Sequence, residues 1–258
     1  IIKGTAETIK VDADYPDHKL SGAVFEVYAD VDNNGEFNAD IDKLAGEMTE
    51  TEPGLYQMKD LVYGNYFLHE KEAPEFFEKD DGYYPFSITE NEAIVRIETE
   101  ADVGFLNKAQ TGSLKVVKTA DDDKIEGRTF KISGTDFMGN DYEQEFKTDE
   151  NGEIHVTLRV GEYTVSEVAG EDSDKYILPD DQTVEIKAGE TTTVKMHNKL
   201  VPEVPSVPQT GDNPWMPAIL STLAGLAVLS GGALLFLRYT GKKRKSADQA
   251  DEDQGTEE

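Results

Sequence analysis

Short runs of alternating apolar and polar residues, rich in Val, Ile, Thr, Tyr and Phe, follow one another along the first 200 residues. Gly and Asp or Asn residues at turns separate the runs, and no segment before residue 213 has a helical period. This pattern is typical of the strands of an antiparallel sandwich. The sequence therefore predicts that this part of the chain is all-β.

The pattern of strands occurs twice, which indicates two tandem copies of one domain. In both copies a Leu stands nine residues before a Glu, at Leu61–Glu70 and at Leu158–Glu167. We expect one domain over residues 3–109 and a second over residues 110–199, with Lys108–Gly112 as the linker between the copies.

The repeated runs resemble the B-type repeat domains of Gram-positive collagen adhesins and pilins, the CnaB, SpaA-like or prealbumin-like family. The most specific stretches are Gly-Ala-Val-Phe-Glu-Val-Tyr at 22–28 and Tyr-Phe-Leu-His-Glu-Lys-Glu-Ala-Pro at 66–74, with a shorter form, Tyr-Thr-Val-Ser-Glu-Val-Ala, at 163–169. The resemblance implies two Ig-like, prealbumin-like β-sandwich domains. It does not imply collagen binding, because the B-type repeats are not the collagen-binding region in that family.

Polar residues stand at positions where the strand alternation predicts core. Successive side chains of a strand point to opposite faces, and five polar residues are in phase with apolar ones. Lys10 is harder to place, because its phase partners are Ala6 and Thr8 while Ile9 and Val11 point the other way. Burying a charge is costly unless it is paired, so the simplest interpretation is a buried Lys–Glu ion pair with an Asn hydrogen bond. The five residues in phase are Glu70, Asn107, Lys118, Glu167 and Asn198.

The family resemblance gives these residues a chemical role. In the family, a Lys on the first strand attacks the Asn side chain on the last strand, ammonia leaves, and a Glu shuttles protons. The resemblance thus implies isopeptide bonds Lys10–Asn107, with Glu70 as the catalytic residue, and Lys118–Asn198, with Glu167. Burial suits this chemistry, because desolvation lowers the pKa of a lysine and raises that of a glutamic acid. Each bond forms once, so we do not expect an enzyme.

A long apolar segment lies near the C-terminus. Met216–Leu237 contains 22 mostly apolar residues, and a helix of that length reaches about 33 Å, enough to cross a bilayer core. Basic residues follow from Arg238, so this end is expected in the cytoplasm and residues 1–212 outside. We therefore predict a transmembrane helix over 213–239 and a charged tail over 240–258.

A Pro-rich linker, 200–212, precedes the apolar segment and contains Val-Pro-Gln-Thr-Gly. Together with the helix and the basic tail, it resembles the LPxTG-type sorting signal of sortase substrates. The first residue is Val207 where the family usually has Leu, which leaves the sortase class open. The resemblance implies cleavage after Thr210 by a sortase and covalent linkage to peptidoglycan or to another pilin subunit. A type I membrane protein with a plain stop-transfer helix is the alternative. The recognition residues are Val207, Pro208, Gln209, Thr210 and Gly211.

Charge and composition exclude some partners and some means of stabilisation. The formal net charge is −28, so a nucleic-acid partner is not expected. Cysteine is absent, so disulfides cannot stabilise the fold. An acidic loop offers oxygen ligands on alternate residues, which is typical of the start of a calcium loop. Ile41 at the twelfth position excludes an EF-hand, and a solvated acidic loop is the alternative. Apart from Ca²⁺, no cofactor is expected. The candidate ligands are Asp30, Asp32, Asn34 and Glu36.

These features favour a structural function: the extracellular stalk of a sortase-anchored cell-wall surface protein, or a pilin subunit. No Ser/His/Asp set, phosphate loop or metalloprotease motif is present. One alternative is a ligand-binding adhesin, whose binding region for a host or matrix ligand lies N-terminal to residue 1 or on these loops. Another is a membrane-bound enzyme with its catalytic domain upstream. The chain starts at Ile1 without a signal peptide, and we expect it to be a fragment.

Overall fold

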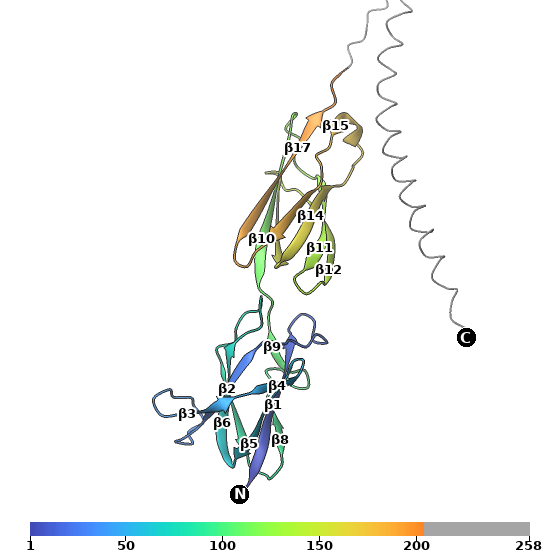
Figure 1. The fold of residues 1–258 in the computed structure, drawn as a ribbon. Coiled ribbons are helices and arrows are strands. Elements are labelled where there is room, and N and C mark those ends of the chain that lie inside the picture. The colour runs from blue at the N-terminus through green and yellow to red at the C-terminus, as the bar shows by residue number, and fades with distance from the viewer. Residues whose placement is uncertain (204–258) are drawn as a thin grey trace, which may run out of the picture. The chain divides into compact units, whose positions relative to one another are not determined.

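The computed structural model describes residues 1–203 (Figure 1). Residues 1–202 form one compact unit. Its regular structure is β apart from a single 3₁₀ turn, Ser173–Lys175, so the all-β prediction is confirmed. None of the helical structure within the described range is long and apolar enough to cross a bilayer. The sorting motif at 207–211, the predicted helix at 213–239 and the tail at 240–258 lie outside the described residues.

The first sandwich consists of two sheets that enclose one core. One sheet has the order β4-β5-β1-β8, with β9 also pairing with β1, and the other has the order β3-β2-β6-β7. Apolar residues alternate along the inner faces, as the sequence pattern predicts. The strands are β1 (Lys3–Asp12), β2 (Val24–Ala29), β3 (Lys43–Glu47), β4 (Thr49–Glu52), β5 (Leu55–Val62), β6 (Gly64–Glu72), β7 (Tyr83–Ile88), β8 (Ile94–Arg96) and β9 (Phe105–Asn107).

The second sandwich repeats this arrangement. Its sheets have the orders β13-β10-β17-β15 and β12-β11-β14-β16, so β10, β11, β13 and β14 take the places of β1, β2, β5 and β6. The strands are β10 (Thr111–Ala120), β11 (Thr129–Asp136), β12 (Asp141–Lys147), β13 (Glu153–Arg159), β14 (Gly161–Glu167), β15 (Tyr176–Ile177), β16 (Gln182–Ile186) and β17 (Thr191–Leu200).

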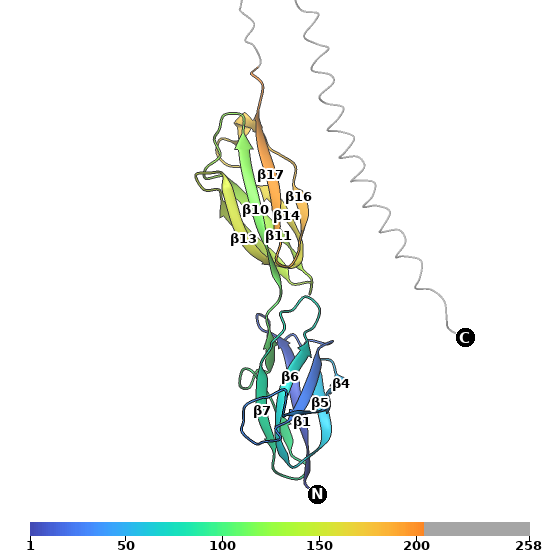
Figure 2. The same cartoon turned by 90° about the vertical axis from the view of Figure 1, so that its left-hand side faces the viewer.

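The first and last strands of each sandwich are parallel neighbours. β1 pairs with β9, and β10 pairs with β17 over eight residue pairs from Ser113↔Thr191 to Ala120↔Asn198. Figure 2 shows β10 and β17 side by side. Parallel neighbours run in the same direction, so the residues near the ends of the two strands can meet on one face of the sheet.

The two cores differ in their packing. The first is rich in aromatic rings: Phe25 packs edge-on against Tyr56 and Phe105, with ring centroids 5.2 and 5.0 Å apart. The second is mostly aliphatic, and Met196 on β17 takes the place that Phe105 has on β9. Both exclude water from the polar residues that reach into them.

Candidate functional site

Three polar side chains meet in the core of the first sandwich. Lys10 on β1 and Glu70 on β6 are fully buried, and Asn107 on β9 is 3% exposed. Asn107 Nδ2 donates to both carboxylate oxygens of Glu70 at 2.9 Å. Lys10 Nζ lies 3.3 Å from Glu70 Oε1 and donates to Asn107 Oδ1. An amine, an amide and a carboxyl group are thus in mutual contact.

The topology explains how these residues meet. In the parallel pair β1 and β9, Lys10 lies opposite Phe105 and Asp12 opposite Asn107, so Lys10 and Asn107 are offset by two residues on the same face. Glu70 comes from the opposite sheet and points across the core. Ala6 and Thr8 are fully buried, so the face that they share with Lys10 is a core face. This face of β1 is buried although its residues are small or polar, which the sequence pattern could not indicate.

The surroundings of Lys10 shift its protonation equilibrium towards the neutral form. Burial lowers its pKa to about 8, although the charges of Glu70 and Asp80 act in the opposite direction. The ring of Phe105 covers Nζ, with its centroid 4.5 Å away. A lysine of lowered pKa is neutral in a larger fraction of molecules near neutral pH, and only the neutral amine is a nucleophile.

The second sandwich contains the same three residue types in the same places. Lys118 on β10 is 1% exposed and Asn198 on β17 is fully buried. Lys118 Nζ lies 3.2 Å from Glu167 Oε2 on β14, and Asn198 Nδ2 donates to Glu167 Oε1 at 2.8 Å. Burial lowers the pKa of Lys118, against the opposing charge of Glu167. The register is also the same, because Lys118 lies opposite Met196 and Ala120 opposite Asn198.

The two centres differ in how many oxygen atoms of their Glu and Asn side chains accept a hydrogen bond. Among the described residues, Glu167 Oε2 and Asn198 Oδ1 are buried without a hydrogen-bond partner. In the first centre the backbone N–H of Asp80 donates to Glu70 Oε2 at 2.8 Å. Asp80 is held by its own carboxylate, which accepts from Gly82 N and from the hydroxyl of Tyr84. The sequence analysis did not identify Asp80, although Asp80-Asp-Gly82 is a recognisable turn signal.

The acidic loop brings two of the candidate ligands, Asp30 and Asp32, together with a third carboxylate, Asp42. Oxygen atoms of Asp30, Asp32 and Asp42 lie within 4.8 Å of one another, and Asp30 and Asp42 are buried. Glu36 is exposed and outside this group of carboxylates. The backbone N–H of Asn34 donates to Asp30 Oδ1.

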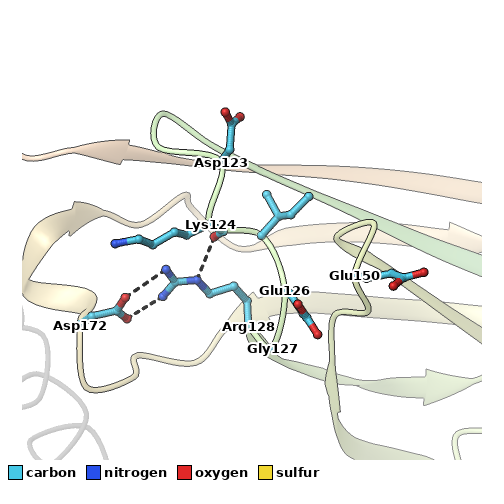
Figure 3. A pocket seen from close by; sticks show the side chains of 8 residues that line it. Asp123, Lys124, Glu126, Gly127, Arg128, Glu150 and Asp172 are labelled. Atoms are coloured by element: carbon cyan, nitrogen blue, oxygen red, sulfur yellow. Dashed lines mark hydrogen bonds and ion pairs between the residues drawn. The ribbon is translucent and has the colours of Figure 1, made fainter.

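A pocket on the surface of the second sandwich involves none of these residues. It lies between the segment Asp123–Arg128, Glu150 and Asp172 (Figure 3). Arg128 donates from both terminal nitrogens to Asp172, at 2.6 and 3.1 Å. This ion pair joins two loops of the same sandwich, so its role is structural.

Comparison with solved structures found several matches. The Bacillus anthracis TIE protein matches with 26% identity and a TM-score of 0.57, over 77% of this chain and 34% of that one. The chain thus spans about a third of that protein. A C-terminal fragment of the pilus adhesin SpaC from Lactobacillus rhamnosus GG is 13% identical (TM-score 0.41, 80% and 99% covered). The shaft pilin SpaA from the same bacterium, in a D295N mutant, is 15% identical (TM-score 0.35, 78% and 100% covered). These two scores add nothing to the fold assignment.

A family model identifies both sandwiches. The model of the SpaA domain, described as a prealbumin-like fold domain, matches residues 4–102 and again residues 112–200. No curated protein was found to match the sequence. The two matches cover most of the chain and confirm the prediction of two tandem prealbumin-like sandwiches. The chain therefore belongs to the SpaA family of prealbumin-like fold domains and carries two of them.

Proposed function

We propose that this protein is the structural stalk of a sortase-anchored surface protein or a pilin subunit, and that each sandwich is closed by an autocatalytic isopeptide bond. The observation that supports the bonds most directly is the repetition of a buried Lys, Glu and Asn at matching register positions in two domains. A buried ion pair often contributes little net stability compared with apolar residues of similar size. Two centres with the same three residue types, each costly to bury, therefore favour a reaction over a structural ion pair.

The reaction is an exchange of one amide for another. The neutral Nζ of Lys10 attacks Cγ of Asn107, and the Cγ–Nζ bond forms. The Cγ–Nδ2 bond breaks, and a proton from Nζ reaches the departing nitrogen through the carboxyl group of Glu70, so that ammonia leaves. No redox step is involved, and the carboxyl group ends in the form in which it began. Lys118, Asn198 and Glu167 carry the same roles in the second sandwich.

The bonds can be detected directly as branched peptides. After exhaustive proteolysis of the purified protein, tandem mass spectrometry is expected to find one peptide that joins Lys10 to Asn107 and another that joins Lys118 to Asn198, each lacking one ammonia. Denatured protein should also migrate faster than a linear chain of its mass, because both loops stay closed. Recovery of only linear peptides containing these four residues would refute the proposed reaction.

The three gathered carboxylates support a second role, calcium binding by the acidic loop. Asp30, Asp32 and Asp42 bring three negative charges within 4.8 Å, and carboxylate oxygens are the ligands that Ca²⁺ prefers. Millimolar calcium is expected to release heat in a titration and to raise the melting temperature. The gain in the free energy of unfolding is about 2.7 kcal/mol when free calcium is 100 times its dissociation constant.

Two variants make the calcium test specific. Asp42→Asn is expected to abolish the heat, because it removes a buried ligand, while Glu36→Gln should leave it unchanged, because Glu36 is exposed and outside the cluster. If the unaltered protein releases no heat, the result would refute calcium binding and favour the alternative, a solvated acidic loop.

A further inference from the structure

The short segment between the two sandwiches is hydrogen-bonded to both. It was expected to be a linker, and it connects the end of β9 at Asn107 to the start of β10 at Thr111. The backbone N–H of Gln110 donates to Phe76 O of the first sandwich, and its carbonyl accepts from Val160 N of the second, at 2.7 and 3.1 Å. Its side-chain amide donates to Phe77 O at 3.2 Å. The connection is therefore part of a packed junction.

Aromatic rings from both sandwiches pack at this junction. Phe77 is buried with Leu20 and Ala109 of the first sandwich, and Phe137 of the second packs against the same cluster. The ring of Phe137 lies 5.3 Å from that of Phe77 and 5.2 Å from that of Phe76. Contact between these rings removes apolar surface of both domains from water, which favours association.

Arg159 at the end of β13 contacts carboxylates of both sandwiches. Its Nη2 donates to Asp12 Oδ2 of the first sandwich at 2.5 Å, and its Nη1 lies 2.9 Å from Asp136 Oδ2 of the second. Asp14 of the first sandwich is 3.9 Å from Nε. Asp12 is fully buried, and the side chain of Arg159 is only 13% exposed. One guanidinium thus neutralises buried charges on both domains.

Three rings enclose the same guanidinium. Its carbon lies 5.1 Å from the ring centroid of Tyr15, 5.9 Å from that of Phe77 and 5.3 Å from that of Phe137. Burial disfavours its charge, but the hydrogen bond to Asp12 and the nearby carboxylates more than offset this, so the pKa of Arg159 lies above its ordinary value. Cation–π contact adds to this attraction when the charge is desolvated.

We propose that Arg159 is a latch that fixes the orientation of the second sandwich relative to the first. Domains that share a chain move relative to each other unless their interface is large and apolar. Here, separating the domains would break the ion pair between Arg159 and Asp12 and expose the packed rings of Phe76, Phe77 and Phe137 to water. The fold itself does not require an arginine at this place, because Val62 occupies the corresponding position of the first copy.

The test measures the distance between the domains in solution. The protein has no cysteine, so spin labels can be placed at Glu52→Cys on β4 and Glu145→Cys on β12, which are both exposed. Pulsed electron–electron double resonance of the protein labelled at these two positions is expected to give one narrow peak in the distance distribution. Arg159→Met keeps the apolar stem but removes the charge, and the narrow peak should be lost to a broad distribution.

Arg128→Met is the matched control. The side chain of Arg128 is 12% exposed, close to the value for Arg159, and makes a bidentate ion pair with Asp172 (Figure 3). It also lies over the ring of Tyr176, and all of these partners belong to the second sandwich. This variant should keep the narrow peak. A narrow peak in Arg159→Met, or a broad one in Arg128→Met as well, would overturn the latch.

A second variant keeps the test decisive if Arg159→Met does not fold. Circular dichroism would reveal such misfolding. Phe137→Ala removes the ring that packs against Arg159 and Phe77 without leaving a carboxylate unpaired. It is also expected to broaden the distance distribution. If Arg159→Met did not fold, a narrow peak in Phe137→Ala would overturn the proposal and a broad one would support it.

Discussion

Replacing Glu70 by Gln is expected to prevent the release of one of the two ammonia molecules. It should also lower the melting temperature of the first sandwich by on the order of 20 °C. Gln cannot shuttle a proton, so the Lys10–Asn107 bond does not form. That bond closes a loop of 97 residues (107 − 10), and by analogy with disulfides its loss costs roughly 4–5 kcal/mol of the free energy of unfolding. Glu167→Gln should act in the same way on the second sandwich. Intact-mass spectrometry and calorimetry provide both readouts.

Glu26→Gln is the control for this experiment. Glu26 is 9% exposed on the neighbouring strand β2, where it accepts from the hydroxyl of Tyr28 and pairs with Lys71. Its replacement should leave both ammonia losses intact and cost no more than about 1 kcal/mol, as for other pairs near the surface. Loss of both ammonia molecules from Glu70→Gln would show that Glu70 is not the proton shuttle.

Cleavage by a sortase is expected to remove everything after Thr210 and to leave the protein covalently linked to the cell wall. Protein released by digestion of the wall should therefore carry peptidoglycan fragments on the carboxyl group of Thr210. In a Gram-positive host with a suitable sortase, Thr210→Ala should abolish this linkage, because the proposed cleavage and transfer take place at the carbonyl group of Thr210. Mass spectrometry of the released C-terminal peptide measures the result.

Ser206→Ala is the neighbouring control, because it lies just outside the pentapeptide and should be anchored as efficiently as the unaltered protein. Detergent-soluble protein that retains Glu258 as its last residue, with no wall-linked form, would favour a plain membrane anchor instead.

The strand alternation in the sequence was enough to predict an all-β chain and to place five of the six polar residues on core faces, while the prealbumin-like domain type and the two sets of Lys, Glu and Asn came from the family resemblance. Lys118 could be placed because Leu114 and Val116 are in phase with it. Lys10 was ambiguous because its inward neighbours, Ala6 and Thr8, are small or polar, and both sides of β1 are largely buried. Burial on both faces removes the contrast on which a phase argument depends.

The acidic loop and the junction depend on contacts that spacing cannot reveal. Asp42 joins Asp30 and Asp32 because the loop turns back on itself, with Phe37 stacked on Tyr83 at 3.6 Å between centroids. Arg159 meets Asp12 across 147 positions of sequence. The sequence predicted only a linker at Lys108–Gly112, because the residues of this segment do not indicate which loops pack against it.

The parallel pairing of first and last strands determines how far the protein could stretch. With both proposed bonds formed, a pull on Ile1 and Leu200 passes along β1 to Lys10, crosses to Asn107, follows β10 to Lys118 and crosses to Asn198. The segments 11–106 and 119–197 lie outside this covalent path. Fully extended, each would otherwise add on the order of 300 Å. With these two bonds, the pair of sandwiches would keep its length under a load that unfolds ordinary sandwich domains.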